Sequence, residues 1–391
     1  MKIVENKDIL VKCQDHFPLP LDRKRIVKFD LPTGSYGLID LSKTQLFAGF
    51  QLVNIDGSAL IGSEHKFTIV EEPLLNCVKA VTVTIGSRPV YKIDSYNFCN
   101  YINKLSYSRQ SLSEDDYFGL TGFGLDTYPL NDPTIGNQKR RYENVQSSIP
   151  WFLKGPLFLP PFQESSLLPA NLNIGIELEL DNTDFMIFRN EDETPYILTQ
   201  LIDFGLSVNY SFTASPISLK SAIKIPYQHQ QIQKYFVKKG EVMTKSGHVT
   251  LPKCPSKLVV FFTPQNLNDQ SKNPFDFKSY GCEQIVLKID GRERLIDLGA
   301  GLEDYSKMYY QTFKGLSRNG EQIGFGRVHL DEGYFVFAID LMKDDYEKRD
   351  GCTMSIRTKH HTPFDTAICV NCMFYYQNVF SVSPSFVVQN V

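Results

Sequence analysis

The chain has 391 residues and almost balanced charges, with 41 basic against 44 acidic residues and a net charge of −3. Because so small a charge creates no strong overall field, specific binding to nucleic acid or to an anionic membrane surface is not expected. The length favours two domains, and the 28 Phe and 20 Tyr beside a single Trp favour strands over helices.

Short segments of alternating apolar and polar residues follow one another along the whole chain. This period of two, interrupted by clusters of Gly, Pro, Asn and Asp, is typical of an all-β protein. The predicted strands lie at 26–31, 38–55, 79–85, 172–180 and 204–212 in the first half, and at 257–262, 284–289, 334–341, 352–358 and 368–376 in the second. Helical periodicity is rare, and the better helix candidates are Asp94–Leu105 and Glu303–Phe313, each of which opens with an acidic residue suited to a helix N-terminus.

One strand-turn-strand unit occurs twice, at an offset of 204 residues. The segment "VTVTIGSRPV" begins at Val81, and the similar "IVLKIDGRERL" begins at Ile285. The offset places the turn Gly86-Ser87 opposite Asp290-Gly291, and in each turn the first residue tolerates a positive φ. Each unit is followed by one of the two predicted helices, with Tyr96 and Tyr101 in the first and Tyr305 and Tyr310 in the second.

A second similarity closes each half of the chain. An alternating strand, a polar turn and a longer strand ending in Ser-Pro occur at 172–216 and again at 352–384. Two similarities in the same order indicate duplication of one β-domain, with a boundary near Ser215-Pro216. We therefore predict two tandem eight-stranded antiparallel jelly-roll sandwiches with a few short helices, at 1–215 and 216–391. The segment 112–161 alternates poorly and is predicted to be a long loop on the first sandwich.

Two motifs could carry chemistry, and both have simpler structural explanations. Cys369 and Cys372 have the spacing of a redox or zinc motif, but in a strand their sulfurs lie on opposite faces, so they are interpreted as core and surface cysteines. The adjacent His360 and His361 could bind copper or zinc, but a polar turn between two strands explains them equally well. No metal, cofactor or catalytic residue is therefore predicted.

Other polar clusters also lack a catalytic context. The basic run Lys139-Arg140-Arg141 is interpreted as a solvated loop, and the acidic groups 114–116 and 344–345 have no partner that would tune a general acid. The chain contains no phosphate-binding loop, nucleophile elbow or zinc-protease motif. It is therefore predicted to be a structural or binding protein and not an enzyme.

The cellular location follows from the termini and the cysteines. The N-terminus lacks the apolar core of a signal peptide, and no apolar run approaches the ~20 residues of a membrane span. Eight scattered cysteines in so large a chain fit reduced thiols better than a disulfide framework. Synthesis in the cytosol without a membrane span is expected.

Four segments together resemble the double jelly-roll major capsid proteins of Polinton/Maverick elements and the related adintoviruses. The first is Tyr36–Leu41 with the following strand and Asp-Gly turn, and the second is Asn273–Phe277 ahead of the turn at Asp290. The third is Gly333–Leu341, and the closing segment "CVNCMFYYQNVFSV" begins at Cys369. The match runs in register from about Gly37 to Phe380, with one extra residue in the first segment and a poor match at 112–161.

The resemblance implies a coat subunit of the virion. Such a subunit would form homotrimeric, pseudo-hexagonal capsomers that tile an icosahedral capsid, together with a penton or minor capsid protein. Two alternatives stay open: a jelly-roll enzyme such as a copper monooxygenase or glycan amidase that uses His360 and His361, and a β-sandwich module that binds glycans or proteins.

The aromatic residues near the end of the predicted loop are the candidate subunit contacts. Trp151 and Phe152 lie in an apolar stretch, and a closed ring of three needs contacts of this apolar kind between unlike faces. The alternative is that Trp151 fills the bottom of its own sandwich.

Overall fold

The structure is a computed structural model, and it describes most of residues 3–390. The residues outside the description are 14, 16, 24, 36, 61–66, 87, 106–119, 123, 125, 127, 128, 131, 163–166, 190–195, 216–220, 299–311, 313–332, 342–350 and 384–387, together with 1, 2 and 391.

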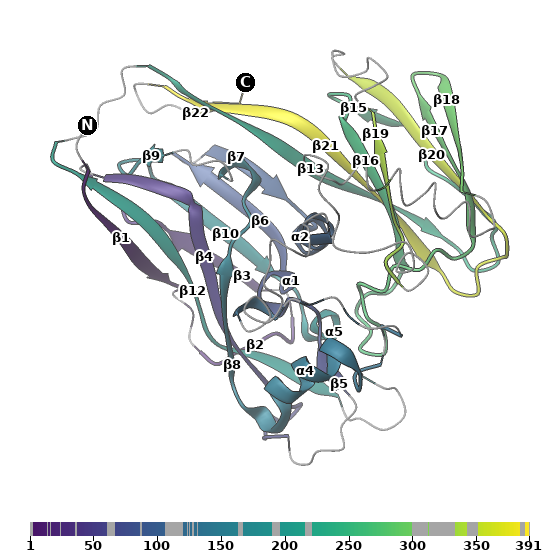
Figure 1. Cartoon of the computed structure of the whole chain (residues 1–391), viewed down its shortest axis with the longest axis horizontal. Helices are drawn as coiled ribbons and strands as arrows, with labels where there is room; N and C mark the ends of the chain where they lie inside the picture. Colours follow the sequence, from purple (N-terminus) through teal and green to yellow (C-terminus); the bar gives the residue numbers. More distant parts are fainter. Residues whose placement is uncertain are drawn as a thin grey trace.

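The strands β1 to β12, called the first set below, form two four-stranded antiparallel sheets and several shorter strands that pair beside them (Figure 1). One sheet has the order β1-β12-β4-β8, formed by Ile3–Lys12, Ile197–Thr213, Gly37–Asn54 and Trp151–Pro156. The other has the order β3-β10-β6-β7, formed by Arg25–Asp30, Ile174–Leu180, Val78–Ile85 and Arg88–Ile93. The shorter strands are β2 (Leu19–Pro20), β9 (Leu167–Pro169) and a separate pair of β5 (Phe67–Ile69) with β11 (Ile187–Arg189).

The strands β13 to β22, called the second set below, form another two sheets with four main strands each. The order β13-β21-β16-β19 comprises Ile223–Val237, Ile368–Val382, Lys257–Pro264 and Val336–Asp340. The order β14-β20-β17-β18 comprises Met243–Lys245, Cys352–His360, Cys282–Ile289 and Arg292–Asp297. Two short strands extend these sheets, β15 (Val249–Leu251) on β20 and β22 (Val388–Asn390) on β21.

Both sets have the same topology. When the eight main strands of each set are numbered in chain order, one sheet is 1-8-3-6 and the other is 2-7-4-5 in both cases. This is the strand order of a jelly roll, in which the chain alternates between the two sheets of a sandwich. The prediction of two eight-stranded antiparallel jelly rolls is confirmed.

The repeated strand-turn-strand unit occupies the same place in each sandwich. Strands β6 and β7 are the fourth and fifth of the first set, β17 and β18 are the fourth and fifth of the second, and their bounds differ by 204 residues throughout. The turns need a positive φ, which is 57° at Gly86 and 46° at Asp290. The chain repeats this unit because it builds the same hairpin in two sandwiches.

The second similarity is also explained by equivalent strands. Strands β10 and β12 are the seventh and eighth of the first set, and β20 and β21 are the seventh and eighth of the second. Strand β10 alternates fully between buried and partly exposed residues, as expected of a sheet with one face on the core.

The helices agree only in part with the sequence. The first predicted helix is α2 (Tyr96–Leu105), whereas the second lies outside the described residues except for Thr312. The remaining described helices are α1 (Pro73–Asn76), α4 (Gly136–Val145) and α5 (Thr183–Met186), with 3-10 turns at Gln146–Ser148 and Pro160–Phe162.

The prediction of one long loop at 112–161 is wrong for its second half. That part contains α4 and the edge strand β8, whose residues Trp151, Leu153 and Gly155 point into the sandwich. The alternation of β8 extends over only six residues with Gly and Pro at its end, so the signal is weak, and pairing with β4 decides the structure.

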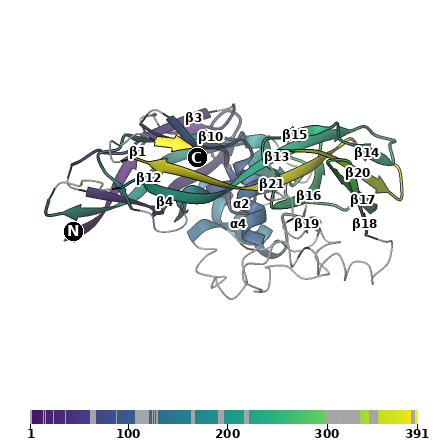
Figure 2. The ribbon, with the colours of Figure 1, turned by 90° about the horizontal axis from the view of Figure 1, so that it is seen from above.

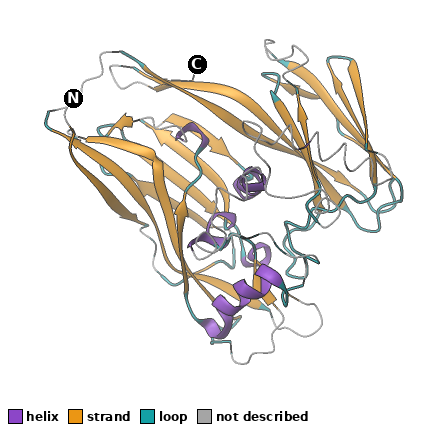
Figure 3. Cartoon of the chain, viewed as in Figure 1, coloured by secondary structure: helices purple, strands orange, loops and turns teal. Residues whose placement is uncertain are grey.

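The two sandwiches stand side by side, as the view from above shows (Figure 2). Strands β13 and β21 extend from the second sandwich past α2 toward the first (Figure 1). Among the described residues, the helices α1, α2, α4 and α5 all belong to the first half of the chain, and Figure 3 shows helical ribbons beside the strands of the first sandwich. Within the described ranges, no helix combines the length and hydropathy needed to cross a membrane.

Candidate functional site: the junction of the sandwiches and the outer face of β8

Helix α2 lies between the two sandwiches and is buried along its whole length. All ten of its residues are buried, although Asn97, Asn100, Asn103 and Lys104 are polar. A helix buried on every side must provide hydrogen-bond partners for such residues, because an unpaired buried polar group costs about 1–3 kcal/mol. The partners of these four side chains therefore show what α2 connects.

The polar side chains of α2 bind residues of both halves. Asn97 donates from Nδ2 to Asp181 Oδ2 at 2.9 Å in the first half. Asn103 and Gln230 exchange two side-chain hydrogen bonds, at 3.3 and 3.1 Å, and the Tyr375 hydroxyl donates to Asn103 Oδ1 at 3.4 Å. Gln230 and Tyr375 belong to β13 and β21, so α2 fastens the second sandwich to the first.

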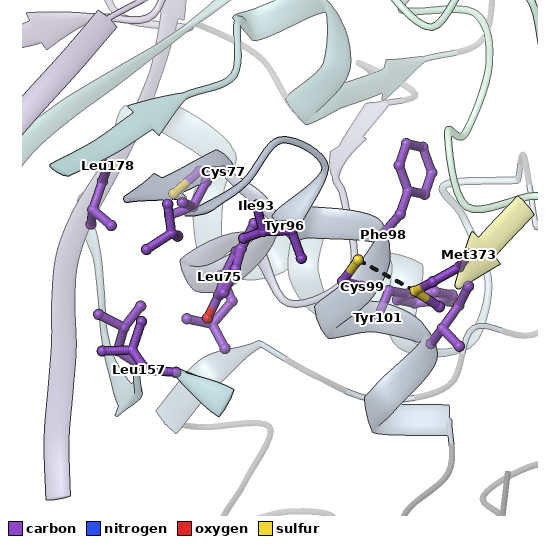
Figure 4. Close-up of a cluster of buried hydrophobic side chains, with 14 of the residues drawn as sticks. Leu75, Cys77, Ile93, Tyr96, Phe98, Cys99, Tyr101, Leu157, Leu178 and Met373 are labelled. Carbon is purple, nitrogen blue, oxygen red and sulfur yellow. Dashed lines mark hydrogen bonds between the residues drawn. The ribbon is translucent and has the colours of Figure 1, made fainter. Parts of the chain in front are cut away.

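Aromatic rings pack in the apolar part of this junction, and Figure 4 shows two of them, Phe98 and Tyr101 of α2, near Met373 of β21. The Phe98 ring lies 5.6 Å from that of Phe261 and 5.7 Å from that of Phe275, and the Tyr101 ring lies 4.3 Å from that of Phe275. Contacts at these distances add to the apolar area that the rings bury. The Cys99 thiol meets the Met373 sulfur at 3.3 Å, so α2 packs directly on β21.

A buried cluster of charges lies beside the aromatic rings. Arg141 is fully buried, donates from Nη2 to Asp126 Oδ2 at 2.7 Å and from Nε to the Ile69 carbonyl at 2.9 Å. The Tyr334 hydroxyl, from the second half, donates to the Asp126 carbonyl at 3.2 Å. The interpretation of Lys139-Arg140-Arg141 as a solvated loop is therefore wrong for Arg141, because α4 turns this residue toward the interior.

Two more carboxylates belong to the same cluster. Glu72 binds Lys104 Nζ at 2.9 Å and Asn100 Nδ2 at 2.9 Å, and its side chain is fully buried. Glu71 accepts a hydrogen bond from the Tyr101 hydroxyl at 2.9 Å. The described cluster thus contains three carboxyl groups and two cations.

The protonation of the cluster follows from this excess of carboxyl groups. Burial raises the pKa of Glu71 well above its ordinary value, and the Asp126 charge raises it further, whereas Arg141 lowers it. Burial also raises the pKa of Asp126, against the effect of its Arg141 partner. The raised pKa of Glu71 favours its protonated form, in which it adds no further negative charge to the cluster.

Trp151 and Phe152 point to opposite faces of β8. Trp151 is 8% exposed, and a Cβ placed on Gly122 would come within 2.8 Å of its ring. Phe152 is 63% exposed and lies on the outer face, where a Cβ on Gly49 would come within 2.8 Å of both Phe152 and Ile202. The contact of either residue with a neighbouring subunit stays a prediction.

The two candidate histidines do not form a common site. His360 is 2% exposed, and its ring nitrogens contact the Thr358 hydroxyl at 2.8 Å and the Tyr280 carbonyl at 3.0 Å. His361 is exposed and bonds Glu283 at 2.9 Å. Burial lowers the pKa of His360 to about 4, so its ring is neutral near pH 7. Among the described residues, no group of three His, Cys, Asp or Glu side chains could hold a metal ion.

The cysteine pair of β21 differs from expectation in one respect. Cys372 is fully buried as expected of a core residue, but Cys369, interpreted as a surface cysteine, is also only 3% exposed. The face of β21 opposite its own sandwich is covered, because Met373 and Tyr375 on that face contact α2. The acidic groups 114–116 and 344–345 lie outside the described residues.

Sequence reasoning missed the charge cluster almost entirely. One available signal was the polar residues on several sides of the helix Asp94–Leu105, which are unusual for a helix that packs one face on a sheet. Nothing local distinguishes Arg141 from Arg140, which is exposed on the same helix.

Comparisons with known proteins find similarity at the level of structure. No protein-family model matches the sequence. No curated protein matches it either. A chain in the cryo-EM structure of the Sputnik virophage superposes with a TM-score of 0.67 at 13% identity, over 100% of this chain and 89% of that one.

Two similar structures are major capsid proteins by name. The mavirus major capsid protein superposes with a TM-score of 0.61 at 10% identity, over 98% of this chain and 90% of that one. The Faustovirus major capsid protein gives 0.56 at 9% identity, over 97% and 91%. At such identities the likeness is one of fold, and the chain has the double jelly-roll fold of these proteins along nearly its full length.

Proposed function

We propose that this chain is a viral major capsid protein, a structural coat subunit of the virion whose homotrimers tile an icosahedral shell. The observation that carries the proposal is the likeness of the whole chain, both sandwiches included, to the mavirus and Faustovirus major capsid proteins. A single sandwich occurs in proteins of many functions, but the likeness here covers both sandwiches, over 98% and 97% of this chain.

The duplicated topology gives a physical reason for a trimer. Each chain contributes two sandwiches of identical strand order, so three chains place six similar units around a threefold axis. Such a capsomer has a nearly hexagonal outline and fits a lattice of hexagons. The α2 junction supports this role, because it fixes the two sandwiches of one chain in a single relative orientation.

The origin within the Polinton/Maverick and adintovirus group is the finer part of the proposal. It rests on the sequence motifs, two of which lie side by side: Phe277 N donates to the Gly333 carbonyl at 2.7 Å, and Phe335 N to the Phe277 carbonyl at 2.9 Å. The motifs are therefore explained by packing within the second sandwich. Penton or minor capsid proteins are the further partners of such a coat.

Phe152 is the proposed subunit contact. A phenylalanine that is 63% exposed on the outer face of an edge strand becomes favourable when a second surface covers it. Trp151, which is buried in its own chain, contributes to the stability of the first sandwich instead.

The proposal is tested by the mass and appearance of the purified full chain. Light scattering should give three times the 44.7 kDa of one chain, and electron microscopy should show particles of hexagonal outline. A monomer at all concentrations that never forms such particles would refute the capsid function.

Neighbouring residues of β8 provide matched variants for the contact. Phe152→Ser should yield a folded monomer with an unchanged melting temperature. Trp151→Ala should lower the melting temperature and leave the trimer intact. A trimer that survives Phe152→Ser would move the interface elsewhere without affecting the capsid assignment.

A further inference from the structure

Two cysteines from distant parts of the second half meet at one end of its sandwich. Cys254 lies in the connection between β15 and β16, and Cys352 is the first residue of β20. Strand β15 pairs with β20 so that Leu251 lies opposite Cys352, which brings the connection back to the start of β20. The Cys254 thiol donates to the carbonyl of Gly351, the residue before Cys352, at 3.8 Å.

The two cysteine side chains lie within interaction range of each other. Burial raises the pKa of the Cys352 thiol, and a hydrogen bond with the Cys254 thiol raises it further. Tyr376 belongs to β21 in the facing sheet. Burial raises the pKa of its hydroxyl, and the nearby Cys352 and Cys254 thiols raise that pKa further. The pair therefore lies where the two sheets of the second sandwich approach each other.

Other thiols of the chain are less suited to react with one another. Cys369 and Cys372 have a short spacing, but they belong to opposite faces of β21. Cys99 meets a methionine sulfur, which forms no disulfide with a thiol. All eight cysteines are free and buried in the structure.

We propose that Cys254 and Cys352 form a reversible oxidation site, at which a peroxide or a small-molecule disulfide links the two sulfurs within one chain. With a small-molecule disulfide, two exchange steps form the protein disulfide and release two small-molecule thiols. With hydrogen peroxide, one thiolate attacks an oxygen atom and becomes a sulfenic acid as the O–O bond breaks, and the hydroxide that leaves takes up a proton to become water. The second thiol then displaces the hydroxyl group as water. In total, two thiols and one peroxide give one disulfide and two waters.

The disulfide would covalently link the segment between β15 and β16 to strand β20, and this link is called the clamp below. The bond closes a loop of about one hundred residues, and a constraint of that size stabilises a fold mainly by restricting its unfolded state. Burial raises the pKa of Cys352 and so keeps the reaction slow at neutral pH. The expected time of oxidation rests on the proposed function, whereas the chemistry of the two thiols does not. A coat subunit is made in a reducing compartment and meets oxidants after the particle leaves the cell.

The experiment uses the purified full chain, reduced and then treated with hydrogen peroxide or with oxidised glutathione. Peptide mapping without reductant should find one intrachain link between the peptides that contain Cys254 and Cys352. Thiol titration in denaturant should show the loss of two thiols. The melting temperature should rise by several degrees and return after dithiothreitol.

Variants separate this site from general oxidation. Cys254→Ser and Cys352→Ser should each abolish the link and the rise in melting temperature, and Cys369→Ser should preserve both. Eight thiols remaining after oxidation, a link between other cysteines or a link between two chains would overturn the proposal. Light scattering on the same samples reports the trimer separately, so failure of the clamp and failure of the capsid function give different results.

Discussion

Replacing Arg141 with methionine removes the charge from the buried ion pair and keeps most of the length of the side chain. Arg141 is fully buried, and its partner Asp126 is 1% exposed at the side chain. Loss of one partner of such a pair leaves an uncompensated buried charge, which costs about 3–5 kcal/mol. We expect a loss of this size in the free energy of unfolding at pH 8.

The loss should be smaller at pH 5. A carboxyl whose folded-state pKa is raised stabilises the fold fully below its unfolded-state pKa, and this stability is lost as pH rises through the folded-state value. The pKa of both Glu71 and Asp126 is raised by burial, and Arg141 opposes the rise. Without Arg141 both values rise further, so the variant should become progressively less stable above about pH 4.5, the ordinary value for Glu71.

Urea unfolding between pH 5 and 8 measures this effect, with the single tryptophan, Trp151, as the fluorescence probe of the first sandwich. Arg140→Met is the matched control on the exposed side of α4 and should change stability little. Adding Asp126→Asn to Arg141→Met should recover much of the loss. A loss that is the same at pH 5 and pH 8 and is not recovered by Asp126→Asn would show that packing, and not charge, explains the role of Arg141.

Three further predictions address the junction, the first sandwich and acid stability. Phe98→Ala should cost about 3–5 kcal/mol of unfolding free energy, because its ring contacts Phe275 and its neighbours between the sandwiches, and calorimetry should then resolve two transitions in place of one. Gly205→Val should destabilise the first sandwich by at least about 1–3 kcal/mol in urea, because even a Cβ would lie 2.3 Å from the Phe47 ring; unchanged unfolding would contradict that geometry. His360 has a pKa lowered to about 4, so the stability it contributes is present above its ordinary pKa of 6.5 and is lost as pH falls through 4. His360→Gln should therefore flatten the acid side of the stability curve by up to roughly 3 kcal/mol, and an unchanged pH profile would rule out this titration.

Short-range sequence patterns determine where the strands and turns of this protein lie. Alternation in β10 and β20 and the turn residues Gly86 and Asp290 depend on neighbours only two or three positions away. This is why the repeated hairpin, the equivalent closing strands and the two-sandwich fold were all predictable. The edge strand β8 was not, because its six residues become a strand only by pairing with β4.

The candidate site is a property of the tertiary structure. Sequence placed Trp151 and Phe152 together as apolar residues, but the pairing of β8 decides that one faces the core and the other faces outward. Likewise, Arg141 is charged in every fold, and its burial is compensated here because Asp126 pairs with it and the Glu71 carboxyl lies within electrostatic range.

The same distinction applies to the second face of a strand. Periodicity predicts that Cys369 leaves the core of its own sandwich, but the same face of β21 meets α2 at Met373, and Cys369 on that face stays buried. Local sequence determines the direction in which a side chain points, because backbone geometry has a fixed period. What lies in that direction is decided by elements hundreds of residues away, and only packing brings them together.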